Sequence, residues 1–428
     1  MITKKALIIT YYWPPAGGPG VQRWLKFAKY LPDFGIEPII YTPENPSYPI
    51  IDKTLEQEVS SDLKIIKTKI REPYAIAELI NSGNKKYKAG QFNQSEKQSF
   101  TDKISIFIRG NFFIPDARKF WVKPSVNFLK NYLSENPVDT VITTGPPHSL
   151  HLIGLELKKT FPELNWLADF RDPWTQISYH SQLKLTKSSE KKHFQLEVKV
   201  LQSCDCVIAT SFTDAENYKK SGAKKVEVIT NGYEESDFEN LEKKFSEKFR
   251  ITYSGGLEMA RNPLVVWKAL KELSIENSDF KKDLELNFCG NISDGVKDSI
   301  EENGLNPNCV FSGYITHKQS IIEIKNSNLL LLTNFPDDSA KGIIPGKLFE
   351  YMATQNQILS VGPDGGDVEK ILNENRSGKH FNHFDKENIT EFIIENYKKF
   401  KKSESGYKIN RAERYTRKSL TCRLAELI

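Results

Sequence analysis

The sequence is poor in sulfur and has no long apolar run. Only five of its 428 residues are cysteine, at positions 204, 206, 289, 309 and 422. Because that number is odd and no Cys-x-x-Cys pair occurs, neither a disulfide framework nor a zinc site is predicted. No apolar segment approaches the roughly 18 residues that a membrane-spanning helix needs. These features together indicate a cytoplasmic protein.

An excess of charge of one sign is also nearly missing. Lys and Arg number 60 and Asp and Glu number 55, which gives a net charge of +5. A dedicated nucleic-acid binder would carry a strongly basic domain, so no nucleic-acid partner is expected. Hydrophobic residues make up 39% of the chain, which excludes wholesale disorder. At about 150 residues per domain, the length predicts two or three domains.

The N-terminal half shows the alternation of a parallel α/β sheet. The apolar start resembles a signal peptide only superficially, because it runs into prolines and glycines without a small-residue cleavage site. We interpret 6–12 as a strand, 14–20 as a loop, the stretch from Val21 to Leu31 as a helix and 36–42 as a second strand. Further strands are expected at 138–143, 164–168, 205–210 and 225–230, with helices at 149–160 and 189–203 among others. The pattern predicts a doubly wound domain over 1–238.

A second α/β domain is predicted over 249–405. It follows a charged segment, 233–249, that we interpret as a linker or a surface helix. Strands are expected at 250–254, 284–289, 309–311, 328–333 and 357–361, and helices at 262–274, 293–303, 317–326, 346–354 and 366–374. The segment 406–428 is expected to be a basic C-terminal helix. Within the first domain, 71–125 breaks the pattern, and its polar part, 81–103, predicts a flexible insertion.

A glycine-rich loop follows the first predicted strand. Gly17, Gly18 and Gly20 let a backbone approach a ligand closely, and the helix start offers N–H groups to an anion. Arg23 stands where a dinucleotide-binding fingerprint has its third glycine, and no acidic residue ends the second strand, so the signal for a dinucleotide is weak. The loop is either a plain turn or a site for a diphosphate or an acceptor.

Polar residues follow two further strands of the first domain. His148 comes just after 138–143, and His151 lies in the helix beyond it. Asp169, Arg171 and Asp172 follow 164–168. The carboxyl ends of parallel strands form the ligand crevice of such sheets. Histidine suits proton transfer, and Asp and Arg suit hydroxyl and phosphate groups. The alternatives are structural histidines and a loop whose charges pair with one another.

Three glycine loops with charged neighbours mark the second domain. They contain Gly255, Gly256 and Arg261, then Lys347 and Glu350 at a helix start, and then Gly365 and Gly366. Lys347 and Glu350 are three apart and share a helix face, so they form either a phosphate and ribose site or a bland ion pair. No Asp-x-Asp pair and no Cys/His metal spacing occurs, so no metal is predicted.

Taken in order, these motifs resemble the glycosyltransferase family 4 type of GT-B enzymes. Four segments are similar to motifs of that family. YYWPPAGGPGVQRW is similar to its N-terminal "PP…GG" loop, and VITNGYEESDF is similar to its "IPNG-x-D-x-x-F" crossing between domains. YSGGLEMARNP is similar to its donor-phosphate loop, and KLFEYMA is similar to its "EAMA" helix. TTGPPHS, DFRDPW and IRGNFFIPDARKFW suggest a bacterial subgroup. The resemblance covers nearly the whole chain. It implies two Rossmann-like domains facing a cleft, with the C-terminal helix returning to the first.

The resemblance also implies roles for individual residues. Arg261 would replace the family's phosphate-binding Lys, Glu350 would match the second Glu of the E-x7-E motif and hold the nucleotide ribose, and Lys347 would add a cation. The first Glu of that motif falls at Gly342 and the other phosphate-loop cation at Gly256. These two departures leave the sugar-contacting part of the site open.

The predicted site therefore has three groups of residues. The catalytic group is His148, Asp169, Arg261 and Lys347. The donor-binding group is Gly17, Gly18, Gly20, Gly255, Gly256, Arg261, Lys347, Glu350, Gly365 and Gly366. The acceptor-binding group is Arg23, Arg171 and Asp172. The resemblance implies metal-independent transfer of a hexose from a nucleotide-diphosphate sugar, with no other cofactor, to a glycan or lipid-linked acceptor with retained configuration, as in cell-surface polysaccharide biosynthesis.

The segment 105–124 combines aromatic and basic residues and has two interpretations. It is either an element that contacts the inner face of the membrane or a part of the N-terminal core. Its apolar members are Phe107, Ile108, Phe112, Phe113, Ile114, Phe120 and Trp121, and its basic members are Arg109, Arg118, Lys119 and Lys123.

Two other functions stay open for the whole chain. One is an NAD-dependent nucleotide-sugar epimerase or dehydrogenase, which the missing third glycine and ribose carboxylate disfavour. The other is a non-catalytic sugar-nucleotide binding protein, because Gly256 and Gly342 replace charged residues of the family.

Overall fold

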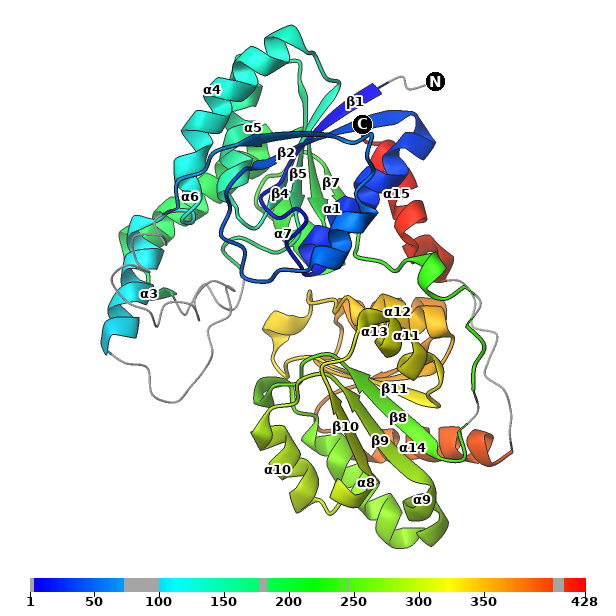
Figure 1. Cartoon of the computed structure of the whole chain (residues 1–428). Coiled ribbons are helices and arrows are strands. Elements are labelled where there is room, and N and C mark those ends of the chain that lie inside the picture. Colours follow the sequence, from blue (N-terminus) through cyan, green and yellow to red (C-terminus); the bar gives the residue numbers. More distant parts are fainter. Residues whose placement is uncertain (1–3, 73–99, 177–182, 240, 245, 403–411) are drawn as a thin grey trace. The chain divides into compact units, whose positions relative to one another are not determined.

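The structure, a computed structural model, describes residues 4–72, 100–176, 183–239, 241–244, 246–402 and 412–428 (Figure 1). The chain divides into two compact units. Unit 1 comprises Met1–Thr230 and Arg417–Ile428, and unit 2 comprises Asn231–Thr416. The chain therefore passes from unit 1 to unit 2 after Thr230 and returns after Thr416.

Unit 1 contains a seven-stranded sheet in the order β3-β2-β1-β4-β5-β6-β7, in which all pairings are parallel. The order reverses beside β1, so the crevice between the ends of β1 and β4 is the topological switch point where such sheets bind ligands. The strands are β1 Lys4–Ile9, β2 Ile36–Pro43, β3 Lys64–Thr68, β4 Thr140–Gly145, β5 Asn165–Phe170, β6 Cys206–Ala209 and β7 Val226–Val228.

Helices cover both faces of this sheet (Figure 1). On one face α1 and α15 lie side by side, and Trp24 of α1 shares a core with Leu420 and Leu424 of α15. The other face carries α4 to α7. The helices are α1 Pro19–Tyr30, α3 Phe100–Phe112, α4 Lys119–Glu135, α5 Ser149–Thr160, α6 Lys187–Ser203, α7 Phe212–Lys220 and α15 Arg417–Ala425.

Unit 2 repeats the same arrangement with six parallel strands in the order β10-β9-β8-β11-β12-β13. Its switch point lies between β8 and β11. The strands are β8 Phe249–Ser254, β9 Leu284–Cys289, β10 Cys309–Gly313, β11 Leu329–Thr333, β12 Gln357–Val361 and β13 Gly378–Phe381.

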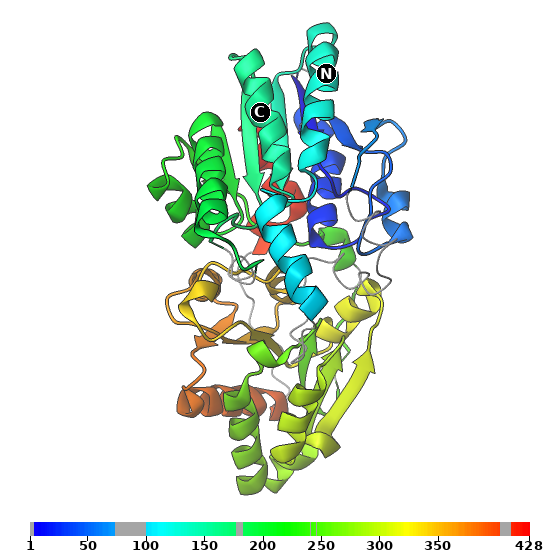
Figure 2. The same ribbon diagram turned by 90° about the vertical axis from the view of Figure 1, so that its left-hand side faces the viewer.

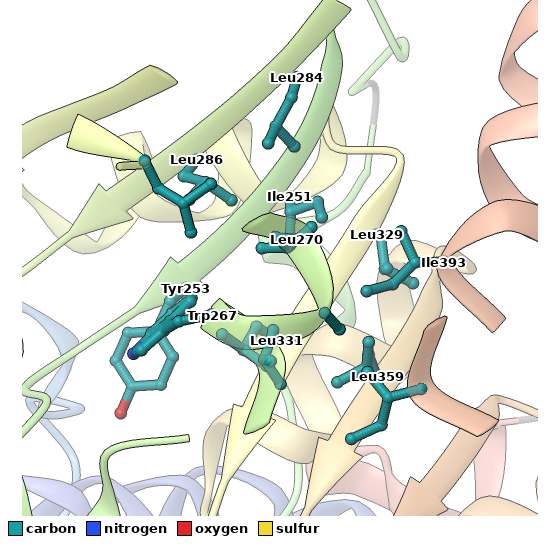
Figure 3. Close-up of a cluster of buried hydrophobic side chains, with 14 of the residues drawn as sticks. Ile251, Tyr253, Trp267, Leu270, Leu284, Leu286, Leu329, Leu331, Leu359 and Ile393 are labelled. Atoms are coloured by element: carbon teal, nitrogen blue, oxygen red, sulfur yellow. The ribbon is translucent and has the colours of Figure 1, made fainter. Parts of the chain in front are cut away.

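One face of the unit 2 sheet packs on four helices, and their shared core is drawn in Figure 3. Ile251 and Leu331 from the strands meet Trp267 and Leu270 of α8 and Ile393 of α14 there. The four helices are α8 Leu264–Glu276, α9 Ser278–Asp283, α10 Asp294–Glu302 and α14 Lys386–Lys401. The opposite face carries α11 His317–Lys325, α12 Lys347–Thr354 and α13 Asp367–Asn375 (Figure 1).

The predicted architecture of two doubly wound parallel sheets is confirmed. Strands β3 and β13 were missed, because these edge strands are short and only partly buried and so lack a continuous apolar run. Most of the expected insertion 81–103 lies outside the described residues, and α3 begins at Phe100, so its last residues are helical. Of the expected helix 406–428, residues 412–416 lie in unit 2 and α15 lies in unit 1.

Candidate functional site

The glycine loop of unit 1 lies at the switch point, directly after β1. Gly18 is the N-cap of α1 and has a φ of 107°, a left-handed conformation that favours glycine. A Cβ on Gly17 would lie 2.9 Å from Cγ2 of Ile50. A Cβ on Gly20 would lie only 1.5 Å from Nη1 of Arg171. The loop therefore needs glycine where Arg171 covers it.

Arg171 joins this loop to the end of the neighbouring strand, β4. Its guanidinium donates a hydrogen bond to the carbonyl of Pro146, and its backbone N–H donates to the carbonyl of Gly145 at 3.0 Å. A fixed guanidinium thus stands beside the first turn of α1, a favourable place for an anion. The structure brings together Gly20 and Arg171, which the sequence assigned to different substrates. Asp172 follows on the same loop and is exposed.

Arg23 and Asp169 instead form a buried network away from solvent. Nη2 of Arg23 lies 3.0 Å from Oδ1 of Asp169, and their side chains are 1% and 0% exposed. Trp24 and Thr144 both donate to Oδ2 of Asp169 at 2.8 Å. The same guanidinium donates to the carbonyls of Ile229 and Thr230, the last residues before the chain leaves unit 1. This geometry gives both residues a positioning role and offers a ligand no exposed atom of either side chain.

The two histidines after β4 sit in an aromatic cluster. The His148 ring is 6% exposed and stacks on Trp174 at 5.1 Å, and the His151 ring stacks on Phe170 at 4.3 Å. Nδ1 of His151 lies 2.9 Å from Oγ1 of Thr143. Burial lowers the pKa of His151 to about 3, so this ring is neutral and structural. Both histidines approach Gly145, where a Cβ would lie 2.6 Å from Nε2 of His151 and 2.9 Å from Nδ1 of His148.

In unit 2, Lys347 lies over the switch point of the sheet. Its Nζ stands 3.9 Å from the centre of the Tyr253 ring, a cation–π contact. Gly255 has a φ of 103°, and a Cβ on it would lie 3.0 Å from that Nζ. Burial, and next the charge of Arg261, lower the pKa of Lys347 to about 7. The ammonium is therefore held in a place that disfavours its charge.

Arg261 is the second cation of this cluster. Its Nη2 donates to the carbonyl of Gly256 at 3.1 Å, and its guanidinium lies 5.7 Å from the centre of the Phe335 ring. Tyr253 also donates to the Gly256 carbonyl, at 2.8 Å. Two cations that repel each other beside a glycine loop favour an anion between them.

Glu350 follows Lys347 by one helical turn and has a partner that the sequence did not indicate. Its Oε1 lies 3.0 Å from Nε2 of His317, whose Nδ1 lies 3.9 Å from Oδ2 of Asp237. His317 is the first residue of α11 and follows the end of β10. A histidine directly after a strand end was a signal in the sequence that could have found this residue.

The loop with Gly365 and Gly366 lies after β12. Gly365 has a φ of 71°, and its N–H donates to Glu369. Within the described ranges, Asp364, Glu369 and His380 are the one group whose ligand atoms are close enough to share a metal ion. The His380 ring already pairs with Ser360 and Pro363, at 2.9 and 3.2 Å. These atoms fix the loop, and Gly366 is the N-cap of α13, where a Cβ would lie 3.2 Å from the backbone oxygen of Lys341.

The structure thus assembles two clusters from the predicted residues, one in each unit. Unit 1 brings together the glycine loop and Arg171, with His148 nearby, and uses Arg23 and Asp169 elsewhere. Unit 2 gathers Gly255, Gly256, Arg261, Lys347 and Glu350 at one switch point. The residues that sequence reasoning missed are Tyr253, Trp174, His317 and Asp237. The sequence did not indicate Tyr253 and Trp174 as site residues, because an aromatic residue in an apolar stretch is interpreted as part of the hydrophobic core.

The segment 105–124 divides between the two interpretations. Trp121 is 1% exposed and stacks on Tyr41 at 5.1 Å, and Arg118 forms an ion pair with Glu72 at 3.2 Å, so these belong to the core. Phe107, Ile108, Phe112 and Phe120 are exposed. Figure 2 shows α3 in cyan and α4 in turquoise. The Asn111 side chain of α3 donates to the carbonyl of Lys184 and accepts from the N–H of Thr186, which holds α3 to the segment before α6. No helix among the residues described is long and apolar enough to cross a membrane.

Comparison with known proteins identifies the fold. A scan against models of protein families and a search of curated proteins both gave no match. Among solved structures, a sucrose-phosphate synthase from Thermosynechococcus elongatus is 14% identical with a TM-score of 0.63, and the alignment covers 99% of this chain and 98% of that one. WaaG, a glycosyltransferase involved in lipopolysaccharide biosynthesis, is 13% identical with a TM-score of 0.52 and 99% of both chains covered.

A further similar structure is described as a UDP-N-acetylglucosamine 2-epimerase from Listeria monocytogenes. It is 9% identical with a TM-score of 0.51, covering 98% of this chain and 94% of that one. At such low identities the likeness establishes the fold and leaves the reaction open. The chain therefore has the GT-B fold, with two Rossmann-like units of parallel strands.

Proposed function

We propose that the protein is a glycosyltransferase that moves a hexose from a nucleotide-diphosphate sugar to a glycan or lipid-linked acceptor. Unit 2 binds the donor and unit 1 contributes to the acceptor. The reaction retains the anomeric configuration, needs no metal ion, and serves cell-surface polysaccharide biosynthesis in a bacterial cytoplasm. The fold shared with WaaG and sucrose-phosphate synthase supports glycosyl transfer.

The observation that carries this proposal is the pair of cations at the unit 2 switch point. Burial and the neighbouring Arg261 hold the pKa of Lys347 at about 7, so its charged form is strained in the free protein. A diphosphate beside both side chains relieves that strain, because each cation then has an opposite charge. In this proposal Glu350, one turn further along α12, accepts hydrogen bonds from ribose hydroxyls.

These groups suit the chemistry of a leaving nucleoside diphosphate. Negative charge grows on the phosphate as the glycosidic bond breaks, and fixed cations stabilise it without reorganising. Arg261 and Lys347 supply this stabilisation. Metal independence follows from the same reasoning, since the two side chains take the place of a divalent ion.

The test is to measure transferase activity in variants of these cations. Arg261→Ala and Lys347→Ala should each lose most activity, about a hundredfold, while the circular dichroism spectrum stays native. Lys297→Ala, which breaks an exposed pair with Asp294, is the matched control and should remain active. Full activity of both variants would contradict the donor site. A thermal-shift screen with UDP-, GDP-, ADP- and CDP-sugars identifies the donor first.

The alternative functions have distinct outcomes in the same assays. An epimerase or dehydrogenase that uses NAD would show a thermal shift with NAD. A binding protein without catalysis would be stabilised by a nucleotide sugar and yet neither hydrolyse nor transfer it. Either result would replace the glycosyltransferase proposal.

We also propose that the exposed side chains of α3 and its neighbour Phe120 rest on the inner face of an anionic membrane. Phe107 and Phe112 are 40% and 64% exposed, and Nζ of Lys119 lies 5.3 Å from the centre of the Phe120 ring. Apolar and basic groups side by side suit the lipid headgroup region. This contact would bring unit 1 to a lipid-linked acceptor.

Flotation with vesicles that contain anionic lipid tests this contact. The double variant Phe107→Ser, Phe112→Ser should bind the vesicles at least severalfold less than the unmodified protein. Phe384→Ser, which removes a Phe that is 89% exposed in unit 2, is the control and should bind normally. No flotation of the unmodified protein would refute the membrane contact and leave the donor site standing.

A further inference from the structure

The side chains of Asp237, His317 and Glu350 lie next to one another, between the segment that enters unit 2 and the proposed donor site. Asp237 lies in the short helical turn Glu235–Asp237, seven residues after Thr230, where the chain leaves unit 1. His317 approaches it at 3.9 Å through Nδ1 and approaches Glu350 at 3.0 Å through Nε2. The three residues come from separate elements of the same unit, so their arrangement is a product of the fold.

We propose that His317 is a positioning residue for Glu350. It holds one oxygen of the Glu350 carboxylate through Nε2, which leaves the other oxygen to accept from the donor ribose. Its Nδ1 faces Asp237 at 3.9 Å, where the two groups attract each other when the ring is protonated. The inference rests on the proposed function, in which Glu350 contacts the ribose. It adds a residue and a connection that the proposed function does not contain.

The start of α11 gives His317 a fixed backbone from which to act. Thr316 is the N-cap of this helix, and its side chain accepts from the Gln319 N–H at 3.3 Å. The Gln319 side chain in turn accepts from the Thr316 N–H at 3.0 Å. This capping box fixes the first turn of α11, so the backbone that carries the His317 ring is rigid. A rigid anchor limits the rotamers of the longer and more flexible Glu350.

The contacts of His317 with Glu350 and Asp237 are partly exposed to solvent. Their exposure determines whether losing them affects fold stability or donor binding. The side chains of His317, Glu350 and Asp237 are 48%, 26% and 36% exposed. Half-exposed charged pairs contribute little to fold stability, because water screens them. Variants of His317 are therefore expected to fold. The cost of removing the ring appears in donor binding, where the carboxylate must meet a hydroxyl in one orientation.

The experiment measures nucleotide affinity and donor kinetics together. The probe is whichever of UDP, GDP, ADP and CDP binds the unmodified protein by titration calorimetry. His317→Ala should weaken that binding and raise the donor KM about threefold to fivefold, the size expected for such a pair, with kcat changed less than about twofold. His317→Gln, which can still donate to Glu350, should recover most of the loss. Lys386→Gln, which breaks an exposed pair with Glu272 in the same unit, should change neither constant.

A double-mutant cycle separates positioning from a general effect. In a Glu350→Ala background, His317→Ala should have no further effect, because the residue it positions is gone. If His317→Ala binds and turns over like the unmodified protein, or weakens binding equally in both backgrounds, the positioning role is overturned. If Glu350→Ala itself leaves nucleotide binding unchanged, or no nucleotide binds, the proposed donor site fails and the role of His317 fails with it.

Discussion

At the scale of single residues, Lys347 shows how burial acts on the charge of a side chain. Its ammonium lies against the face of Tyr253 and beside Gly255, with Arg261 opposing its charge. A lysine in such surroundings is easily neutralised, since water no longer stabilises the charged form. An anion that binds beside Lys347 therefore both contacts its ammonium and favours the protonated form of this side chain.

This arrangement predicts proton uptake on nucleotide binding above neutral pH. With a pKa of about 7 in the free protein, Lys347 is about nine-tenths neutral at pH 8. A bound diphosphate raises that pKa, so binding at pH 8 should take up close to one proton, and binding at pH 6 should take up almost none. Calorimetry in buffers of different ionisation enthalpy measures the uptake.

Lys347→Met is the control for this pH effect, because it keeps the packing over Tyr253 and removes the ionisable group. Its binding should be weaker and should show no uptake at pH 8. Equal uptake by this variant would assign the proton to another group.

A second prediction concerns the close approach of Arg171 to Gly20. Gly20→Ala places a methyl group where the guanidinium lies, so Arg171 must move away from the loop. Acceptor KM should rise, by roughly tenfold for a lost contact to a charged group. The obstruction is a side chain and not backbone, so the protein still folds.

The combination of substitutions tests this reading. In an Arg171→Ala background, Gly20→Ala should add little, because the three atoms nearest to the added methyl group all belong to the Arg171 guanidinium. Additive effects of the two substitutions would mean that the loop itself, and not Arg171, is disturbed.

At the scale of secondary-structure elements, α15 connects the C-terminal residues to the first unit. Leu420 and Leu424 are fully buried in the core that also holds Trp24 of α1. This helix is short, so its stability comes from packing and not from its own propensity.

Leu420→Ala should lower the free energy of unfolding of unit 1 by about 2 to 5 kcal/mol. Five of the six tryptophans, all except Trp267, lie in unit 1, so tryptophan fluorescence during urea unfolding reports mainly on this unit. Arg423→Ala, at an exposed position of the same helix, is the control and should change the midpoint little. A normal midpoint for Leu420→Ala would contradict the packing of α15.

The elements also show what the sequence could and could not predict. Buried strands such as β11 and β12 are runs of apolar residues, so their positions were predicted to within one residue. The edge strands β3 and β13 have half-exposed faces and gave no such run. In the site, glycines and charged residues after strand ends were found because topology places all strand ends at one edge. Arg23 lies within α1 and Asp169 within β5, and only tertiary packing decides that they face each other inside the core.

At the scale of the whole molecule, the division into two units predicts that a ligand acts on one of them. A nucleotide that binds only to unit 2 stabilises it by about 2.7 kcal/mol at a concentration of one hundred times Kd. Calorimetric unfolding should then show one transition that moves up and one that stays.

Hydrogen exchange identifies which unit responds. Protection should increase around 253–261 and 341–353, and the amides of β1 to β7 should change little. If the nucleotide increased protection in unit 1 alone, it would bind to unit 1, and the assignment of the donor site to unit 2 would be wrong.

The chain passes from unit 1 to unit 2 and back again, which has a consequence for the order in which the protein folds during its synthesis. Unit 1 needs residues from both ends of the described chain, whereas unit 2 is one uninterrupted stretch between them. On the ribosome, every residue of unit 2 emerges before Arg417, so α15 is the last element that unit 1 receives. Unit 1 therefore completes its fold only after the whole of unit 2 has been synthesised, which departs from the usual order in which the N-terminal domain matures first.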